Sequence, residues 1–128
     1  MRPEFRAWTE EGKAMYYGVY PFKDGTLLLS YDGIAFDEVP ASDFILMQST
    51  GLKDKNSKEI YEGDIVRYEC CFESYVEEVI YDDKHCNFGT IDKYEKTFSF
   101  DALISDFDVD CFEVVGNKYE NLELLGGK

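Results

Sequence analysis

The stretch MQSTGLKDKNSKEIYEGDIVRYE, residues 47–69, combines turn-forming residues, three lysines and alternating apolar residues, and it decides how the chain is divided. Its segment from 51 to 57 is polar and rich in lysine, which is typical of a connection between two parts of a chain. We place the boundary there, between an N-terminal portion, residues 1–52, and a C-terminal portion, residues 53–128. Three roles are open for the stretch: a binding loop, a catalytic loop or the entrance to a barrel.

Gly63 and Asp64 form the most informative short motif within this stretch. A strand is expected from Asp64 to Tyr68, and a Gly-Asp step is common where the first strand of a small barrel begins. Glycine permits the tight turn, and an aspartate carboxylate can accept backbone N–H bonds there. We therefore predict a structural turn at Gly63 and Asp64 rather than a catalytic Asp64.

Short apolar runs separated by Gly and Asp-Gly steps, such as Asp24-Gly25 and Asp32-Gly33, dominate the rest of the chain and indicate β-hairpins. Aromatic residues make up 16% of the sequence, and they pack well on the surface of a sheet. The best helical pattern is short and covers 100–107. A mainly β fold with at most one or two short helices is therefore expected. Strands are predicted at 5–8, 14–17, 26–29, 64–68, 75–81, 88–94 and 112–115.

The composition sets limits on the function. The chain has 128 residues and a net charge of −14. A general nucleic-acid-binding protein needs a basic face, because contacts to phosphates supply most of the non-specific affinity, so the charge argues against that class. The same charge is ordinary for a highly soluble protein. It also leaves open an acidic decoy that mimics nucleic acid and occupies a basic host protein.

The N-terminal residues, MRPEFRAWTEEGK, have no apolar segment after a basic start, so they do not resemble a signal peptide. The sequence has no run of about 18 apolar residues, which a membrane-spanning helix needs. We therefore expect a cytoplasmic protein without membrane binding, whose four cysteines are reduced thiols.

Lys53, Lys55 and Lys58 place three of the thirteen basic residues within six positions. They suit a solvated turn, and in so acidic a chain a positive loop has two natural partners, phosphate or the acidic face of another copy, of which we favour docking against another copy. Such docking should weaken with salt, because exposed charges are screened over about 8–10 Å at physiological ionic strength. We take the three lysines as a candidate interaction loop, together with aromatic residues expected to be exposed, such as Tyr61 or Tyr68.

Four cysteines, Cys70, Cys71, Cys86 and Cys111, and the single histidine, His85, are the residues that a zinc site would use. Structural zinc sites usually draw two ligands from a C-x2–4-C segment. Cys70 and Cys71 are adjacent instead, and on a strand they would point to opposite faces. The sequence therefore predicts buried free thiols, which behave as small apolar groups, and no metal site.

Asp106, Asp108 and Asp110 have the spacing of the start of a calcium-binding loop. Such a loop has Gly at its sixth position and Glu at its twelfth, where this chain has Cys111 and Asn117. An acidic strand edge, which discourages unwanted strand pairing, or a solvated acidic stripe is the better interpretation.

Catalytic signatures are few. The sequence has one His and contains no Gly-x-Ser-x-Gly elbow, no Walker loop and no dinucleotide-binding fingerprint. A carboxylate-dependent hydrolase stays open as an alternative because there are 27 acidic residues, but no spacing selects one pair of them. We expect no enzymatic activity and no cofactor, and we assign no catalytic, cofactor-binding or metal-binding residue.

Three groups of residues, which span nearly the whole chain, match one known family. They are Phe5-Arg6-Ala7-Trp8 with Met15-Tyr16-Tyr17; Met47-Gln48 with 50–54 and 59–66; and Val115-Gly116-Asn117 with Tyr119-Glu120-Asn121 and Leu124-Leu125. With these residues the chain resembles the YopX family of phage and prophage proteins from Gram-positive bacteria. The resemblance implies a mainly β protein with a C-terminal part similar to SH3-type barrels, and a homo-oligomer. It supplies no catalytic residues.

Two positions depart from the family. Ser57 stands where the family usually has Gly, and a left-handed Ser costs roughly 1 kcal/mol more than Gly, so a longer or differently shaped turn is expected. Leu122 stands where the family often has Pro. We expect Leu122, Leu124 and Leu125 to close the barrel, and extension to the sheet edge of a neighbour is the alternative.

These observations predict a phage- or prophage-encoded, non-catalytic, oligomeric interaction protein in the cytoplasm of a bacterial host. Its partners would be copies of itself and a host or phage protein. General nucleic-acid binding and membrane binding are not expected. The acidic decoy and the carboxylate-dependent hydrolase are the two alternatives.

Overall fold

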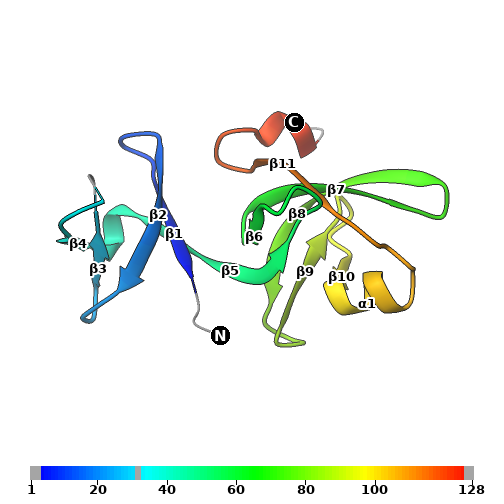
Figure 1. Ribbon diagram of the computed structural model, residues 1–128, viewed down its shortest axis with the longest axis horizontal. Coiled ribbons are helices and arrows are strands. Elements are labelled where there is room, and N and C mark those ends of the chain that lie inside the picture. Colours follow the sequence, from blue (N-terminus) through cyan, green and yellow to red (C-terminus); the bar gives the residue numbers. More distant parts are fainter. Residues whose placement is uncertain (1–3, 31–32, 126–128) are drawn as a thin grey trace. The chain divides into compact units, whose positions relative to one another are not determined.

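The computed structural model describes residues 4–30 and 33–125, and in this part of the chain it consists of antiparallel β-sheets with one short α-helix (Figure 1). The mainly β class expected from the sequence is confirmed. The chain divides into two compact units, Met1–Ser49 and Thr50–Lys128, so the division comes after residue 49 where residue 52 was expected. Within the described residues, no helix is long and apolar enough to cross a membrane.

The N-terminal unit is an antiparallel sheet. Its strands are β1 (Phe5–Thr9), β2 (Ala14–Pro21), β3 (Thr26–Leu29), β4 (Asp37–Pro40) and the first part of β5 (Ile45–Lys53), and the 3-10 helix η1 (Ala41–Asp43) precedes β5. The strand order is β4-β3-β2-β1-β5. Trp8 in β1 is opposite Met15 of β2 on one side and Ile45 of β5 on the other. The strand β1 is therefore an inner strand of this sheet, with a neighbour on each side, although it is the first in the sequence.

A small apolar core holds the N-terminal unit together. Ala7, Val19, Leu27 and Leu29 are buried in one cluster. The three strands predicted at 5–8, 14–17 and 26–29 lie in β1, β2 and β3. These strands supply the four residues, but Val19 comes from the part of β2 beyond the predicted end at residue 17. Burial of apolar side chains from neighbouring strands is the main favourable contribution to such a sheet.

Two strands of this unit, β4 and β5, were not predicted. Pro40 ends β4, and the polar composition of 51–57 obscures the strand character of β5. Of the predicted Asp32-Gly33 turn, Asp32 lies outside the described residues. The backbone N–H of Gly33 donates a hydrogen bond to the Ser30 hydroxyl at 2.7 Å.

The C-terminal unit contains a five-stranded antiparallel sheet. Its strands are β7 (Asp64–Cys70), β8 (Glu73–Asp82), β9 (Asn87–Ile91), β10 (Thr97–Ser99) and β11 (Glu113–Asn117), in the order β10-β9-β8-β7-β11. The short strand β6 (Glu59–Tyr61) pairs with β5. In Figure 1 the long strands β7 and β8 bend across the unit. This sheet forms the part of the chain for which an SH3-like barrel was expected.

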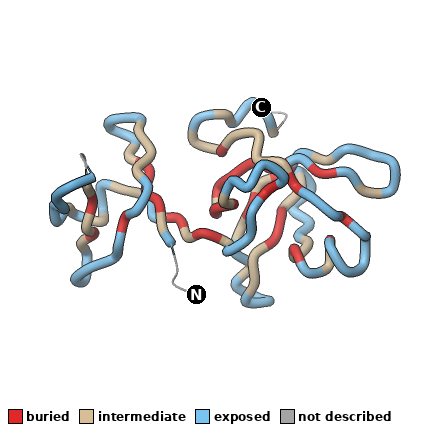
Figure 2. Tube along the Cα trace, in the orientation of Figure 1, coloured by how far each residue is buried: buried red, intermediate tan, exposed pale blue. Residues whose placement is uncertain are grey.

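The core of the C-terminal unit draws on most of its elements. Figure 2 shows buried residues concentrated along the central strands and exposed residues in the turns. The buried cluster comprises Ile60, Val66, Tyr68, Val79, Phe100, Leu103, Val109 and Phe112. Phe100 and Leu103 belong to the helix α1 (Phe100–Ser105), so the helix packs into the same core as the strands.

The helix α1 begins at a capping serine. The Ser99 side chain accepts a hydrogen bond from the backbone N–H of Ala102 at 3.0 Å, as an N-cap residue should. The helix predicted over 100–107 is present but ends earlier, at Ser105.

The strands β9 and β10, which precede the helix, approach very closely at Gly89, where an added Cβ would overlap the backbone carbonyl of Phe98.

The last described segment does not form a barrel strand. Leu122 and Leu124 are exposed, and they belong to a 3-10 helix, η2 (Leu122–Leu125), which contacts β8. The turn before η2 is fixed by Asn117, whose side-chain oxygen accepts the backbone N–H groups of Tyr119 and Glu120 at 2.9 and 3.0 Å. These side-chain bonds favour a turn over a further strand. The expectation that the leucines close the barrel was therefore wrong.

Candidate functional site

The lysine-rich segment at 53–58 is a rigid turn built around a buried carboxylate. Asp54 is 7% exposed, and its carboxylate accepts backbone N–H bonds from Asn56 and Lys58 at 2.8 Å each and from Val114 of β11 at 2.9 Å. Burial alone would raise the pKa of Asp54. The three N–H donors and the nearby Lys58 charge outweigh that effect and lower it. The carboxylate therefore holds the turn in one shape.

The backbone of the turn makes further bonds. The N–H of Asp54 donates to the carbonyl of Lys58 at 2.7 Å, and the N–H of Lys55 donates to the carbonyl of Phe112 at 2.8 Å. Ser57 has φ of 65°, a left-handed conformation that an L-residue adopts only at a steric cost. The chain thus uses a serine in the conformation that suits glycine.

The three lysines of this turn differ in their surroundings. The ammonium group of Lys55 lies 3.5 Å from Glu113, which also binds Arg67 at 3.1 Å. The hydrogen bond from Arg67 is the main reason that the pKa of Glu113 is lowered, and Lys55 adds to it. Lys53 and Lys58 are exposed, and in the described part of the chain no ion pair involves either of them. Lys53 and Lys58 are thus the two lysines of the turn whose side chains are exposed without an ion pair among the described residues, and the charge of Lys58 also acts on Asp54.

Tyr61 and Tyr68 are not exposed, so the prediction that they belong to an interaction surface was wrong. Their exposed fractions are 7% and 5%. Tyr68 stacks on Tyr75 with 5.5 Å between ring centroids, and its hydroxyl donates to Glu77 at 2.7 Å. Burial, followed by this hydrogen bond, raises the pKa of Tyr68. Tyr68 belongs to the apolar core of the unit, and Tyr61 is buried next to the core residue Ile60 in β6.

The Gly63–Asp64 step forms the bend between β6 and β7. Gly63 has φ of 85°, which glycine adopts without steric cost. The carboxylate of Asp64 accepts the backbone N–H of Tyr61 at 2.8 Å, and Asp64 is 1% exposed. The N–H of Gly63 donates to the carbonyl of Val79 at 2.9 Å. The geometry is that of a structural turn, and the carboxylate is closed off from solvent.

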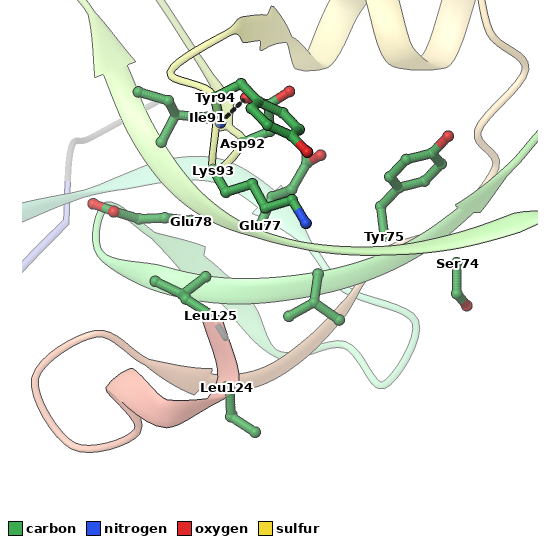
Figure 3. A pocket seen from close by; sticks show the side chains of 11 residues that line it. Ser74, Tyr75, Glu77, Glu78, Ile91, Asp92, Lys93, Tyr94, Leu124 and Leu125 are labelled. Atoms are coloured by element: carbon green, nitrogen blue, oxygen red, sulfur yellow. Dashed lines mark hydrogen bonds between the residues drawn. The ribbon is translucent and has the colours of Figure 1, made fainter. Parts of the chain in front are cut away.

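An open hollow of about 580 Å³ lies on the C-terminal unit (Figure 3). It was not predicted, because its lining comes from three separate segments. They are 74–78 of β8, 91–94 at the end of β9 and the following turn, and Leu124 and Leu125 of η2. Its apolar surface includes Val76 and Tyr94, which are 39% and 79% exposed. The hollow therefore combines apolar side chains with the carboxylates of Glu77, Glu78 and Asp92.

Each of these three carboxylates already has a partner within the fold. Glu77 accepts the hydroxyl of Tyr68, and Glu78 pairs with Lys118 at 3.1 Å. Asp92 accepts the backbone N–H groups of Tyr94 and Lys96 at 2.8 and 2.9 Å, and the first of these bonds is drawn in Figure 3. Their arrangement is that of groups that stabilise turns and strands.

The family model described as YopX protein matches residues 4–126, which is nearly the whole chain. The chain belongs to the YopX family. Among solved structures, the crystal structure of protein EF1440 from Enterococcus faecalis is similar to it, with 29% sequence identity and a TM-score of 0.68. The similarity covers 98% of this chain and 99% of that one. No curated protein matches the sequence.

The closing motif of this YopX chain has a clear structural role. An added Cβ at Gly116 would lie 2.6 Å from the side-chain oxygen of Asn121. That oxygen accepts the backbone N–H of Asn117 at 3.1 Å, while the N–H of Asn121 donates to the carbonyl of Asn117 at 2.8 Å. Gly116, Asn117 and Asn121 therefore form one interlocked turn after β11.

The cysteines of the YopX chain are free thiols, but they are not buried as predicted. Cys71, Cys86 and Cys111 are exposed, and Cys70 is partly buried. Within the described residues, no group of three or more His, Cys, Asp or Glu side chains could hold a metal ion. His85 bonds to Asp82 at 2.7 Å, and this bond is the main cause of the lowered pKa of Asp82.

Cys70 and Cys71 do not point to opposite faces, because β7 ends at Cys70 and Cys71 is left-handed with φ of 56°. Asp106, Asp108 and Asp110 are all exposed and lie in the loop between α1 and β11. Of the two alternatives for these aspartates, the strand edge was wrong, and the solvated position is the one observed.

Proposed function

We propose that this YopX-family protein is a phage- or prophage-encoded, non-catalytic interaction protein that assembles with copies of itself in the cytoplasm of a bacterial host. The resemblance of its three motifs to phage and prophage proteins supports the genetic context. A host or phage protein is the expected further partner. The contact that we assign to self-assembly is the basic turn at 53–58.

One observation carries this proposal. The turn is held by the three N–H bonds of Asp54, and it presents the exposed side chains of Lys53 and Lys58. A rigid backbone lowers the entropy lost on binding, because only the side chains have to be ordered. In a chain with a net charge of −14, every neighbouring copy offers acidic side chains to two such cations. Charge complementarity of this kind increases association rates and fixes orientation.

The absence of catalysis is proposed on separate grounds. Glu77, Glu78 and Asp92 line the same hollow, but each one is engaged by a hydroxyl, an ammonium group or backbone N–H groups of the fold. A carboxylate-dependent hydrolase instead needs two acids whose environments separate their pKa values for acid and base roles. The hollow with its exposed Val76 and Tyr94 suits contact with a macromolecule better.

Sedimentation velocity on charge variants tests self-assembly. The variant Lys53→Glu/Lys58→Glu is compared with wild type and with Lys23→Glu/Lys84→Glu, which alters two other exposed lysines by the same amount of charge. At low salt, wild type and the control should sediment as the same oligomer, and the turn variant should sediment as a smaller species. High salt should weaken the wild-type oligomer, because exposed charges are screened.

Two results would overturn the proposal. One is a monomeric wild type at low salt. The other is an equal loss of assembly in both charge variants, which would assign the effect to the overall net charge. Salt alone is not decisive, because it also screens the mutual repulsion of copies that each carry −14.

The acidic decoy is a second candidate, and it is favoured by the net charge of −14 from 27 acidic and 13 basic residues. Its partner would be a basic nucleic-acid-binding protein of the host. Capture of such a protein from host lysate at low salt, with release by added double-stranded DNA, would support this function. Capture that persists at a large excess of DNA would contradict it.

A further inference from the structure

The hairpin between β7 and β8 has an unusual two-residue turn. Cys70 and Glu73 are paired at the ends of the two strands, so that Cys71 and Phe72 form the turn. Both turn residues are left-handed, with φ of 56° and 70°. Turns of this kind strongly prefer Asn-Gly, Asp-Gly or Gly-Gly, because other L-residues meet steric clashes there. Cysteine followed by phenylalanine is thus a costly choice for this turn.

Packing does not explain that choice. The side chain of Phe72 is fully exposed, and Cys71 is exposed as well. Neither residue therefore buries apolar surface that would offset the backbone strain. A strained conformation without a packing reason is a basis for a hypothesis of function.

The effect of the strain is to bring two thiols together. Consecutive residues of a strand point to opposite faces, but the left-handed Cys71 turns its side chain back toward Cys70. The two sulfur atoms lie 3.4 Å apart. The thiol of Cys70 also lies 3.8 Å from the carbonyl oxygen of Phe107, which holds it in place. The outer thiol of the pair is accessible, and the inner one is positioned behind it.

We propose that Cys70 and Cys71 form a dithiol site that is modified by low-molecular-weight disulfides. The thiolate of Cys71 attacks one sulfur of the incoming disulfide, forms a mixed disulfide and releases one thiolate. The sulfur of Cys70 then attacks the Cys71 sulfur, closes the Cys70–Cys71 disulfide and releases the second thiolate. Each cysteine loses one proton, the two protons end on the two released thiols, and the incoming disulfide is the oxidant.

The surroundings of the pair fit this order of events. The pKa of Cys70 is raised, chiefly by its hydrogen bond with Cys71, followed by burial and the negative charges of Cys71 and Asp108. The exposed thiol of Cys71 is the one that an incoming disulfide reaches first, and the partly buried thiol of Cys70 lies behind it. Once Cys71 is in a mixed disulfide, its thiol no longer makes the hydrogen bond or carries the negative charge that raise the pKa of Cys70. Cys70 is then easier to deprotonate for the second step.

The closed form should be readily reduced. Adjacent Cα atoms are about 3.8 Å apart across a trans peptide, whereas disulfides usually join Cα atoms about 4.4–6.8 Å apart. Closure therefore strains the ring, and strained or exposed disulfides are the labile ones. The site is one for reversible modification rather than a permanent cross-link.

Mass spectrometry of the full chain tests the proposal. In a Cys86→Ser/Cys111→Ser background, only the Cys70–Cys71 pair can react. After reduction and exposure to excess oxidised glutathione, the peptide with both cysteines should lose two hydrogen atoms and carry no glutathione. A further Cys70→Ser change should leave a stable mixed disulfide on Cys71. Dithiothreitol should restore both thiols.

The reverse background, Cys70→Ser/Cys71→Ser, is the matched control. It retains Cys86 and Cys111 and should form mixed disulfides only. Circular dichroism on all variants verifies that the fold is retained. Three results would overturn the proposal: a wild-type pair that keeps glutathione on Cys71, a pair that stays reduced while Cys86 or Cys111 reacts, or cross-linking between chains in place of closure.

Discussion

The carboxylate of Asp54, in the turn between β5 and β6, accepts a hydrogen bond from the backbone N–H of Val114 in β11 at 2.9 Å, across 60 positions of the chain. The same carboxylate accepts the N–H groups of Asn56 and Lys58 within its own turn. One buried side chain thus shapes the basic turn and ties it to the edge strand of the C-terminal sheet. This double role makes Asp54 the most informative position for mutagenesis.

The change Asp54→Asn should lower the free energy of unfolding by about 1–3 kcal/mol, because buried N–H groups lose a charged acceptor and one of them faces the amide NH₂ group. Urea denaturation followed by circular dichroism measures the difference. The control is Asp24→Asn, at an exposed position, which should change the free energy by less than about 0.5 kcal/mol. Equal stability of both variants would show that the Asp54 bonds contribute little.

The free energy of unfolding should depend on pH in part through the ionisation of Asp54. Burial opposes ionisation, but its N–H partners and Lys58 lower the pKa of Asp54 in the folded protein. The unfolded chain then binds a proton more readily than the folded chain. The contribution of Asp54 to the free energy of unfolding is complete above the pKa of the unfolded chain, about 3.9. It is lost as the pH falls through the lower pKa of Asp54 in the folded protein.

Denaturation curves of wild type and Asp54→Asn measured from about pH 6 down to about pH 3 isolate this effect, since other acids contribute equally to both. Wild type should lose more stability over this range than the variant does. Parallel curves would mean that Asp54 titrates alike in the folded and unfolded chain.

The change Ser57→Gly should stabilise the protein. Ser57 is left-handed, which costs an L-residue about 1–2 kcal/mol. Glycine avoids this cost, but part of the gain is lost because glycine makes the unfolded chain more flexible and so raises the entropy lost on folding. We expect a net gain of about 0.5–1 kcal/mol in the free energy of unfolding. Ser57→Ala is the matched control and should bring no gain, because alanine meets the same steric penalty. A gain with both substitutions would point to the loss of the hydroxyl instead.

The change Gly89→Ala should weaken the pairing of β9 with β10. A Cβ at this position would overlap the backbone of Phe98, which cannot move aside as a flexible side chain could. Overpacking of this kind costs about 1–3 kcal/mol. Faster amide hydrogen exchange in β10, together with a lower denaturation midpoint, is the expected result. Gly12→Ala, where the new Cβ would make an ordinary contact with Thr9, should leave both measurements near wild type.

Local signals in the sequence predicted the elements that depend on local interactions. The Gly63–Asp64 bend needs a left-handed residue followed directly by a short carboxylate side chain, so these two residues are enough to predict it. The helix was predicted over 100–107 from the spacing of Leu103, Ile104 and Phe107, and it forms at Phe100–Ser105. Of those three residues only Leu103 is buried. Both features are properties of a few consecutive residues.

Features that arise from distant contacts could not be predicted in this way. Tyr61 is buried in the folded chain, and no feature of its neighbours in the sequence reveals that. The partner of Lys55 is Glu113, which lies in β11. The close approach of the Cys70 and Cys71 thiols depends on a left-handed turn formed by Cys71 and Phe72. Residue preferences would not place such a turn at a Cys-Phe sequence, because it favours Asn-Gly, Asp-Gly or Gly-Gly.

The bond between Asp54 and Val114 has a consequence for the newly made chain. Bacterial and other ribosomes add about 5–20 residues per second, so residue 114 follows residue 54 by roughly 3–12 s. During that interval the carboxylate can bind only the two N–H groups of its own turn, and the carbonyl of Phe112 is not yet available to Lys55. The turn that presents Lys53 and Lys58 thus reaches its final shape only after β11 has been synthesised. Under the self-assembly proposed above, contacts between the turn and other copies would form only after that point.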